Sequence, residues 1–383
     1  MNPIYLDHAA TTPVHPEVVE RMLPYLSEYF GNASSTHRAG RDARAALNAA
    51  RDRISAFIGC SPAELVFTGS GTESDNTAIF GAAEAASGRG RHIITTQIEH
   101  HAVLHACERL EKFGYEVTYL PVDTAGRVSV RDVEAAVRPD TILISVMYAN
   151  NEVGTLQPVQ EIGALAREKG ILFHVDAVQA LGHVPIDLGS LPVDFMSFSA
   201  HKLSGPKGTG ALYIARTARV APLLYGGSQE RKRRAGTENT AGIVGFAEAV
   251  KIFEGARYEM QQKLEKLRQE MVMEFGRRLG PGGYVVNGHE SERLPHILNV
   301  SFPGVSTESL LMNLDMAGVA AASGSACTSG SLEVSHVLRS MGLPEEVTAS
   351  AVRFSFGRTN DEAQVAAAAE QVERIVTRLR RQA

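Results

Sequence analysis

The stretch "ELVFTGSGTESDN", residues 64–76, joins a short apolar run to a sequence that is typical of a helix start. Ser70, Gly71 and Thr72 stand where the predicted strand turns into the predicted helix. A glycine permits close approach of the backbone to another group, and the first N–H groups of a helix are free to bind an anion. Thr72 could instead be only a helix N-cap, and the stretch does not match the nucleotide P-loop. The residues therefore predict a strand–turn–helix unit with a candidate anion site.

The same alternation of strand and helix continues along the chain. Helical patterns separate further apolar runs, which are "HIITTQ", "YEVTYLPV", "TILISVMYANN", "ILFHVDA", "DFMSFSA" and "GALYIA". Strands that alternate with helices predict an α/β fold with a mostly parallel, seven-stranded sheet that helices cover on both faces. Sheets of this kind bind ligands beyond the carboxyl ends of their strands.

The composition is that of a folded enzyme. The 383 residues are 44% hydrophobic and 21% charged, and the net charge of −5 gives no reason to expect a nucleic-acid protein. The start, "MNPIYLDHAATTP", does not resemble a secretory signal, and no apolar run is long enough to cross a bilayer. Three cysteines without a CxxC pair argue against a disulfide framework or a cysteine-built zinc site. We therefore expect a cytoplasmic protein with no membrane segment and no intrinsic metal.

The pattern changes in the C-terminal part of the chain. A helical stretch covers about residues 239–278, with Gly255 as a predicted break. Beyond "GPGG", strand-like and helical segments resemble a smaller α+β unit. We therefore predict a large cofactor-binding domain over residues 15–255 and a small domain made of residues 1–14 and 256–383.

Lys202 lies in "SFSAHKLSGPKGTG", residues 197–210, directly after a predicted strand. A lysine in a glycine-rich loop is more often a solvated surface group, with the glycines forming turns. The other interpretation is a desolvated Schiff-base lysine that is directed at a carbonyl. This stretch alone does not decide between the two.

Asp176 ends the apolar run "ILFHVDA" and is predicted to lie at the edge of the sheet. A carboxylate there is costly without a cationic partner, and a protonated pyridine nitrogen would be such a partner. A helix N-cap or a structural ion pair explains many aspartates of this kind equally well.

His100 precedes a predicted helix in "QIEHHAVLH", where His101 and His105 share one helix face. The pair lacks the HExxH order and an obvious third ligand, which argues against zinc. His100 stands at the strand-to-helix turn, where its ring could face the ligand cleft and stack on a flat molecule. A lysine, an aspartate after a buried strand and a helix-start anion site are together the parts that hold pyridoxal 5′-phosphate.

The ordered set of motifs resembles the cysteine desulfurases, fold-type-I pyridoxal phosphate enzymes of the class V aminotransferase group. The resemblance runs from Tyr5 to Arg358, and the long loop around Cys327 resembles the iron–sulfur and nitrogenase branch of this family. The motifs are "YLDHAATTP", "FGNASSTH", "GTESDN", "EHHAVL", "ANNEVG", "HVDAVQ", "SFSAHK", "GPKGTGALY", "RAGTEN", "SGSACTSGSLE" and "RFSFGR".

The resemblance implies a role for each matching position. Lys202 would carry the cofactor as a Schiff base, Asp176 would pair with its ring nitrogen, and His100 would stack on its ring. Asn151 and Gln179 would bind the ring substituents, and Arg353 would clamp the substrate carboxylate. The phosphate would be held by Gly71, Thr72, Ser199, His201 and, from the second subunit of a homodimer, Thr237.

Cys327 lies in "SGSACTSGS", whose small and polar residues give little core packing. The alternative of a small buried hydrophobe fits Cys107 and Cys60 better. The resemblance implies that Cys327, in a loop of about residues 322–332, takes the sulfur of L-cysteine as a persulfide and leaves L-alanine. It also implies transfer to a sulfur acceptor or scaffold protein for iron–sulfur assembly, tRNA thiolation or cofactors. Cys327 could there transiently ligate a nascent cluster.

Three other functions remain open from the sequence. A selenocysteine lyase or a class V aminotransferase would share the fold, and a non-catalytic assembly scaffold would be expected to lose Lys202 or Cys327. The basic segment "QERKRRAGTEN" near Thr237 is either a solvated loop or a docking patch for an acidic partner.

Overall fold

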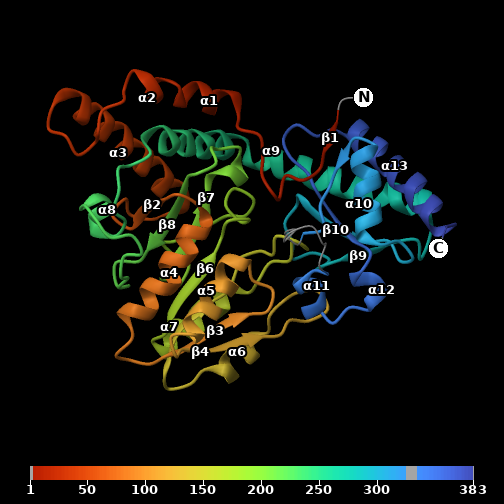
Figure 1. The fold of residues 1–383 in the computed structure, drawn as a ribbon, viewed down its shortest axis with the longest axis horizontal. Helices are drawn as coiled ribbons and strands as arrows, with labels where there is room; N and C mark the ends of the chain where they lie inside the picture. The colour runs from red at the N-terminus through yellow and green to blue at the C-terminus, as the bar shows by residue number, and fades with distance from the viewer. Residues whose placement is uncertain (1–2, 325–333, 383) are drawn as a thin grey trace.

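A large seven-stranded sheet forms the centre of the molecule, whose computed structural model describes residues 3–324 and 334–382 (Figure 1). Its strand order is β2-β8-β7-β6-β5-β3-β4, and every neighbouring pair from β7 to β4 is parallel. β8 pairs antiparallel with both β7 and β2. The strands are β2 (Leu65–Thr68), β3 (His92–Thr96), β4 (Glu116–Leu120), β5 (Thr141–Ser145), β6 (Leu172–Asp176), β7 (Phe195–Ser199) and β8 (Gly210–Ile214). The predicted α/β fold with a mostly parallel sheet is confirmed.

Helices cover both faces of this sheet, so its central strands are buried on both sides. On one face, α4 (Gly71–Ala85) and α5 (His101–Glu111) pack with strand residues such as Ile93 and Leu212. On the other face, α3 (Arg38–Ile58), α7 (Val159–Lys169) and part of α9 (Thr240–Leu279) form the largest hydrophobic core. Burial on both faces explains why the strand sequences read as continuous apolar runs rather than as alternating ones.

The predicted break at Gly255 is wrong, because α9 is one continuous helix from Thr240 to Leu279. A glycine inside a helix costs about 1 kcal/mol relative to alanine. The helix packs against α3 on one part of its length and against α13 (Glu362–Arg380) on another. Contacts on both sides of Gly255 therefore outweigh its low helix propensity.

A smaller sheet lies beside the large one, with order β12-β10-β9 and antiparallel pairing. Its strands are β9 (Val285–Asn287), β10 (Ile297–Ser301) and β12 (Ala351–Ser355). A separate hydrophobic core joins this sheet to α10 (Thr307–Met316), α13 and the C-terminal half of α9. The N-terminal strand β1 (Ile4–Tyr5) pairs with β11 (Val319–Ala320) in the same region. The boundaries between the large and the small domain, after residues 14 and 255, stay a proposal.

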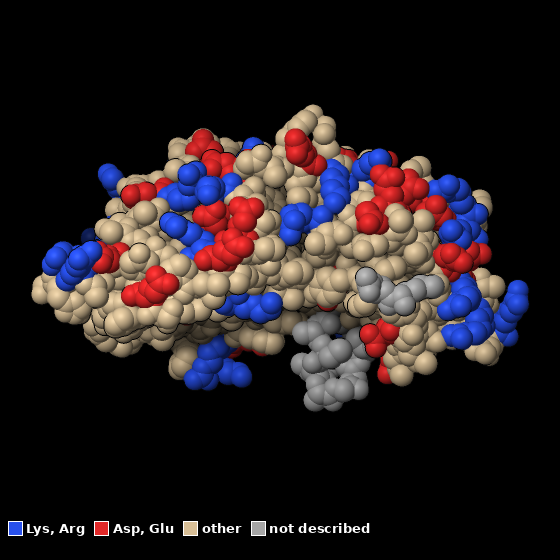
Figure 2. Space-filling view, turned by 90° about the horizontal axis from the view of Figure 1, so that it is seen from above, with Lys and Arg blue, Asp and Glu red and all other residues tan. Residues whose placement is uncertain are grey.

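The remaining helices are short: α1 (Pro16–Met22), α2 (Pro24–Ser27), α6 (Val130–Ala136), η1 (Ala200–Leu203), α8 (Gln229–Lys232), α11 (His336–Ser340) and α12 (Glu345–Thr348). None of the helices within residues 3–324 and 334–382 has the length and apolar character that a bilayer crossing requires. On the face shown in Figure 2, acidic and basic side chains are interspersed rather than segregated.

Candidate active site

A pocket of about 430 Å³ opens at the carboxyl ends of the central parallel strands. It brings together ten of the candidate residues from the sequence: Gly71, Thr72, His100, Asn151, Asp176, Gln179, Ser199, His201, Lys202 and Arg353. These residues come from both halves of the chain, and the pocket lies where open parallel sheets bind their ligands.

The start of α4 forms one wall of the pocket. Ser70 is its N-cap, and its hydroxyl oxygen accepts a hydrogen bond from the Glu73 N–H at 3.1 Å. Gly71 must lack a side chain, because a Cβ there would lie 2.5 Å from a methyl carbon of Val178. The first-turn N–H groups of Gly71 and Thr72 have no intrahelical acceptor, so they are available to an anionic group in the pocket.

Lys202 lies on η1, the short helix that follows β7. Its Nζ donates hydrogen bonds to the carbonyl oxygens of Ala9 and Ala10 at 2.5 and 2.8 Å. The N-terminal segment is tied to η1 by Thr12, whose hydroxyl donates to the His201 carbonyl at 2.6 Å. Burial, together with a smaller contribution from the Arg353 charge, lowers the pKa of the Lys202 amine to about 8. The amine is thus far easier to deprotonate than a surface lysine.

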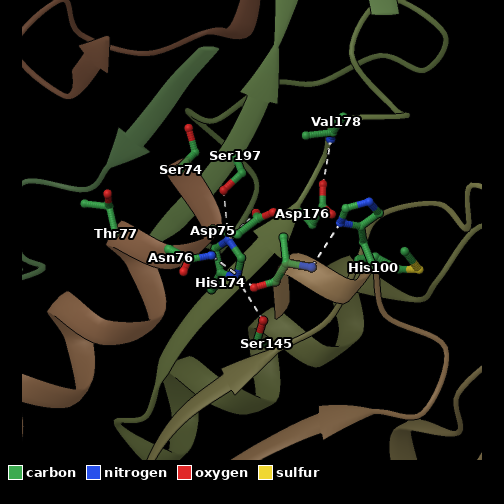
Figure 3. Close-up of polar contacts among 12 residues, drawn as sticks. Ser74, Asp75, Asn76, Thr77, His100, Ser145, His174, Asp176, Val178 and Ser197 are labelled. Carbon is green, nitrogen blue, oxygen red and sulfur yellow. Dashed lines mark hydrogen bonds and ion pairs between the residues drawn. The ribbon is translucent and has the colours of Figure 1, made fainter. Parts of the chain in front are cut away.

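Asp176 is the last residue of β6, and its buried side chain lines the pocket near His100 (Figure 3). Its Oδ1 accepts a hydrogen bond from the Val178 N–H at 2.9 Å. Burial raises the pKa of Asp176 to about 7, and the neighbouring Asp75 carboxyl raises it as well. A cation at this position would strongly favour the ionised form.

His100 is the N-cap of α5 and lines the pocket. Its Nδ1 accepts a hydrogen bond from the Ala102 N–H at 3.1 Å, which fixes the ring at the helix start. Desolvation lowers the pKa of His100 to about 4, with a smaller contribution from the Lys202 charge. The imidazole is therefore neutral at pH 7.

Arg353 extends from β12 of the smaller sheet into the pocket. Its guanidinium donates to the Asp7 carboxylate at 2.8 Å and to the Asn151 carbonyl at 2.8 Å. Its Nε has no hydrogen-bond partner among the described residues. A buried guanidinium that lines the pocket suits a ligand carboxylate, since its planar fork can donate two parallel hydrogen bonds.

The other candidates complete the walls of the pocket. The Gln179 side chain donates to the Ala9 carbonyl at 2.9 Å, and His201 Nδ1 lies 3.1 Å from the Thr11 hydroxyl. Burial lowers the pKa of His201 to about 4. Ser199 ends β7 beside this histidine.

Two of the candidates are not among the described residues that line the pocket. Thr237 is exposed, and among the described residues it is not one of those that line the pocket. Cys327 lies outside the described residues, although Ala322 and Gly324 at the start of its segment line the pocket.

Sequence reasoning assigned no role to Asp7 and Asp75, and both line the pocket. Asp7 belongs to the quoted motif "YLDHAATTP", but nothing in the sequence places it beside Arg353. Asp75 stands four residues after Gly71 on a helix, so the two share a face, and this spacing was the available signal.

The residues present fit pyridoxal 5′-phosphate. A buried carboxyl for the ring nitrogen, free helix N–H groups for the phosphate and an amine of lowered pKa line one pocket. The side chains of Asp176 and His100 also lie close together in Figure 3. The pocket could therefore hold a flat, phosphorylated pyridine together with a substrate carboxylate at Arg353.

Known proteins resemble the chain over its whole length. Residues 4–367 match the family described as Aminotransferase class-V. The chain is 50% identical to a cysteine desulfurase IscS of Methanosarcina thermophila, over 98% of this chain and 93% of the relative. It is 48% identical to a cysteine desulfurase IscS of Dictyoglomus turgidum, over 98% and 95%. A solved NifS-like protein superposes with a TM-score of 0.92 at 38% identity, over 98% of this chain and 99% of that one.

Proposed function

The chain belongs to the class-V aminotransferase family, in which it is a pyridoxal phosphate-dependent cysteine desulfurase, and from this premise we propose which residues carry its reaction. The convergence of Lys202, Asp176 and Arg353 on one pocket is the observation that supports the proposal. The relatives are named cysteine desulfurases, which favours this activity over that of an aminotransferase.

The first group of residues holds the cofactor. Lys202 would attach it covalently, and the start of α4 with Ser199 and His201 would bind its phosphate. Asp176 would keep a proton on the ring nitrogen, and His100 would cover the ring. When bound, pyridoxal phosphate supplies an electron-accepting ring that stabilises negative charge at the substrate Cα.

The second group acts on L-cysteine. Arg353 binds the substrate carboxylate through its planar guanidinium. Lys202 takes the proton from Cα, since an amine with a pKa near 8 is well matched to proton transfer at neutral pH. His100 is neutral at pH 7 and can accept the proton of the substrate thiol.

Cys327 then takes the sulfur. Its thiolate attacks the substrate sulfur atom, so that an S–S bond forms while the Cβ–S bond breaks. The electron pair of the broken bond stays on Cβ, which gains a proton and leaves as the methyl group of L-alanine. One L-cysteine and one Cys327 thiol thus give one alanine and one Cys327 persulfide.

The persulfide sulfur would pass to an acceptor thiol. The name IscS of the relatives supports iron–sulfur cluster assembly as the destination. The family resemblance implies tRNA thiolation and other cofactors as further destinations. We also propose that the protein acts in the cytoplasm as a homodimer, and that Thr237 of each subunit reaches the phosphate in the other.

The Cys327→Ser variant tests this function. It should still bind cofactor and change its absorbance with L-cysteine, because these steps use Lys202. Sulfide and alanine production should fall by several orders of magnitude, since a serine hydroxyl is a poor nucleophile at neutral pH. Peptide mass spectrometry of cysteine-treated wild type should find one extra sulfur on the Cys327 peptide.

The peptides that contain Cys60 and Cys107 are the internal controls. Burial raises the pKa of Cys60 to about 11 and that of Cys107 still higher, so neither should carry the sulfur. Near-normal desulfuration by Cys327→Ser, or extra sulfur on Cys107, would show that sulfur leaves without a Cys327 persulfide.

A further inference from the structure

A second carboxyl group lies at the base of the pocket, beside Asp176. Asp75 belongs to α4, is 1% exposed and lines the pocket with Asp176. Its Oδ1 lies 3.5 Å from Nε2 of His174 and has no hydrogen-bond partner among the described residues. A buried carboxyl oxygen without a partner is costly, so a function for this residue is to be expected.

A row of hydrogen bonds next to this carboxyl joins Ser145, His174 and Ser197 (Figure 3). The register of the sheet pairs Ser145 with His174 and Asp176 with Ser197, so their side chains face α4 together. His174 Nδ1 lies 2.8 Å from the Ser145 hydroxyl, and its Nε2 lies 3.0 Å from the Ser197 hydroxyl.

The donors in this row of hydrogen bonds can all point toward Asp75. Burial lowers the pKa of His174 to about 4, so the ring is neutral at pH 7 and carries one N–H. The Ser197 hydroxyl, which lies 3.0 Å from His174 Nε2, favours the ionised form of Asp75. If the Ser197 proton points at Asp75, Nε2–H of His174 donates to Ser197, and Nδ1 accepts from Ser145. Every donor in the row then supports negative charge on Asp75.

The two aspartates oppose each other's ionisation. Burial raises the pKa of Asp75 to about 7. The pKa of Asp176 is also raised, mainly by burial and to a smaller extent by the neighbouring Asp75 carboxyl. The other titratable groups around them are His174 on β6, Glu99 and His100 before α5, and Lys202 on η1. Burial raises the pKa of Glu99 to about 8, so that it adds little charge at pH 7. A cation near the two aspartates would favour the ionised form of each.

We propose that Asp75, oriented by His174 and Ser197, is a positioning residue that acts with Asp176 to keep the proton on the cofactor's ring nitrogen. This inference rests on the proposed role of Asp176. A negative charge near a protonated nitrogen raises the pKa of that nitrogen, and the removal of the charge lowers it. Asp75 thereby strengthens the ring as an electron acceptor without touching the substrate.

The test compares two cofactors in the absence of substrate. Dissociation constants are measured for pyridoxal phosphate and for its 1-deaza analogue, in which carbon replaces the ring nitrogen. In wild type, the ring nitrogen should give a binding advantage over the analogue. Asp75→Asn should reduce this advantage about tenfold, which corresponds to one pKa unit at the nitrogen. The ¹⁵N chemical shift of labelled, bound cofactor should show the same loss of protonation.

Asp194→Asn is the matched control. Asp194 is also a largely buried aspartate of the sheet region, and it accepts a hydrogen bond from the Phe173 N–H, but it does not line the pocket. It should leave the ratio of the two dissociation constants unchanged. Ser197→Ala is the milder second variant, which should shift the ratio in the same direction as Asp75→Asn by weakening support for the Asp75 charge.

The outcomes separate this inference from the proposed function. Asp176→Asn should lose the binding advantage of pyridoxal phosphate over the 1-deaza analogue. If Asp75→Asn and Ser197→Ala keep this advantage in full, Asp75 does not act on the ring nitrogen and the inference is wrong. If Asp176→Asn also keeps it, the proposed role of Asp176 fails, and the inference fails with it.

Discussion

Lys202 shows how a single amine is prepared for chemistry by its surroundings. Its Nζ is held by the carbonyl oxygens of Ala9 and Ala10, which lie almost 200 positions away in the sequence. The Lys202→Ala variant should lose the cofactor absorbance that borohydride reduction fixes to the protein. It should also lose all sulfide production from L-cysteine, and both are read from absorbance spectra and a sulfide assay.

Lys207→Ala is the control, since Lys207 is exposed in the same glycine-rich loop and does not line the pocket. It should keep both properties. A reduced cofactor adduct that mass spectrometry maps to Lys207 would mean that the wrong lysine has been assigned.

Arg353 is positioned by the Asp7 carboxylate and the Asn151 carbonyl. An Arg353→Lys variant keeps the charge but loses the planar fork that binds a carboxylate with two hydrogen bonds. We expect the KM for L-cysteine to rise at least about tenfold, which corresponds to about 1.4 kcal/mol, while the cofactor affinity stays the same. Steady-state kinetics and cofactor titration measure the two quantities. A fall in kcat with an unchanged KM would instead place Arg353 outside the carboxylate site.

At this scale, the sequence predicts residues whose chemistry is explicit in a motif, and it misses those that act through distant partners. Lys202 and Asp176 follow predicted strands, so the topology of a parallel sheet places them at one edge. The contact of Asp7 with Arg353 depends on how the N-terminal segment crosses to the smaller sheet, and no local pattern contains that information. Asp75 was hidden because a polar residue in the first turns of a helix usually needs no explanation.

The start of α4 is an element whose geometry depends on one glycine. A Gly71→Ala variant would place a Cβ 2.5 Å from Val178, so the helix start must shift away from β6 and β7. We expect cofactor affinity to fall about tenfold or more, because the first-turn N–H groups move with the backbone. Equilibrium titration with pyridoxal phosphate measures the change.

Gly255→Ala is the matched substitution in α9, where a Cβ would have no neighbour within 4 Å. It should raise the free energy of unfolding by about 0.5–1 kcal/mol and leave cofactor affinity alone, since Ala is the better helix former. Equal cofactor affinity in Gly71→Ala and wild type would contradict the proposed phosphate site.

Helices and strands could be predicted from the sequence where its hydrophobic pattern agrees with the burial of the residues in the fold. The strand-to-helix alternation predicts the large sheet because both faces of that sheet are buried. The break expected at Gly255 failed because propensity is local, whereas α9 is held by α3 on one part and by α13 on another. The antiparallel pairing of β8 could not be predicted either, since an apolar run does not specify the direction of its neighbour.

The whole molecule should lose stability in acid through its buried histidines. His183 and His296 stack with ring centroids 3.8 Å apart. Burial lowers the pKa of His183 from 6.5 to about 4 and that of His296 well below 6.5. Since the pKa is lower in the folded state, the stability is complete above pH 6.5 and is lost as the pH falls toward 4. Each such histidine contributes up to about 1.4 kcal/mol per pH unit in this window.

The His183→Gln variant should therefore show a shallower fall in the free energy of unfolding between pH 6.5 and 4. Urea unfolding at a series of pH values measures this slope. His105→Gln, in which an exposed histidine is replaced, should follow the wild-type slope. Parallel slopes for wild type and His183→Gln would mean that this ring takes up its proton without unfolding.

The last prediction concerns the proposed homodimer. Thr237 is exposed and does not line the pocket of its own chain among the described residues, so its proposed phosphate contact requires a second copy. Thr237→Ala subunits keep Lys202, whereas Lys202→Ala subunits keep Thr237. A mixed dimer of the two therefore regains one site that carries neither lesion. In isolated mixed dimers, one of the two sites should be intact, so about half of the wild-type activity is expected.

The measurement is sulfide production by mixed dimers that are isolated through two different affinity tags. Activity should exceed the sum of the two parents, because each parent dimer contains a lesion in both of its sites. The tagged wild-type dimer sets the scale, and dimers of each single variant set the baseline. Recovery no greater than that baseline would place Thr237 in the same site as the Lys202 of its own chain. Each subunit would then hold a complete phosphate site, and the second copy would not be needed for the chemistry.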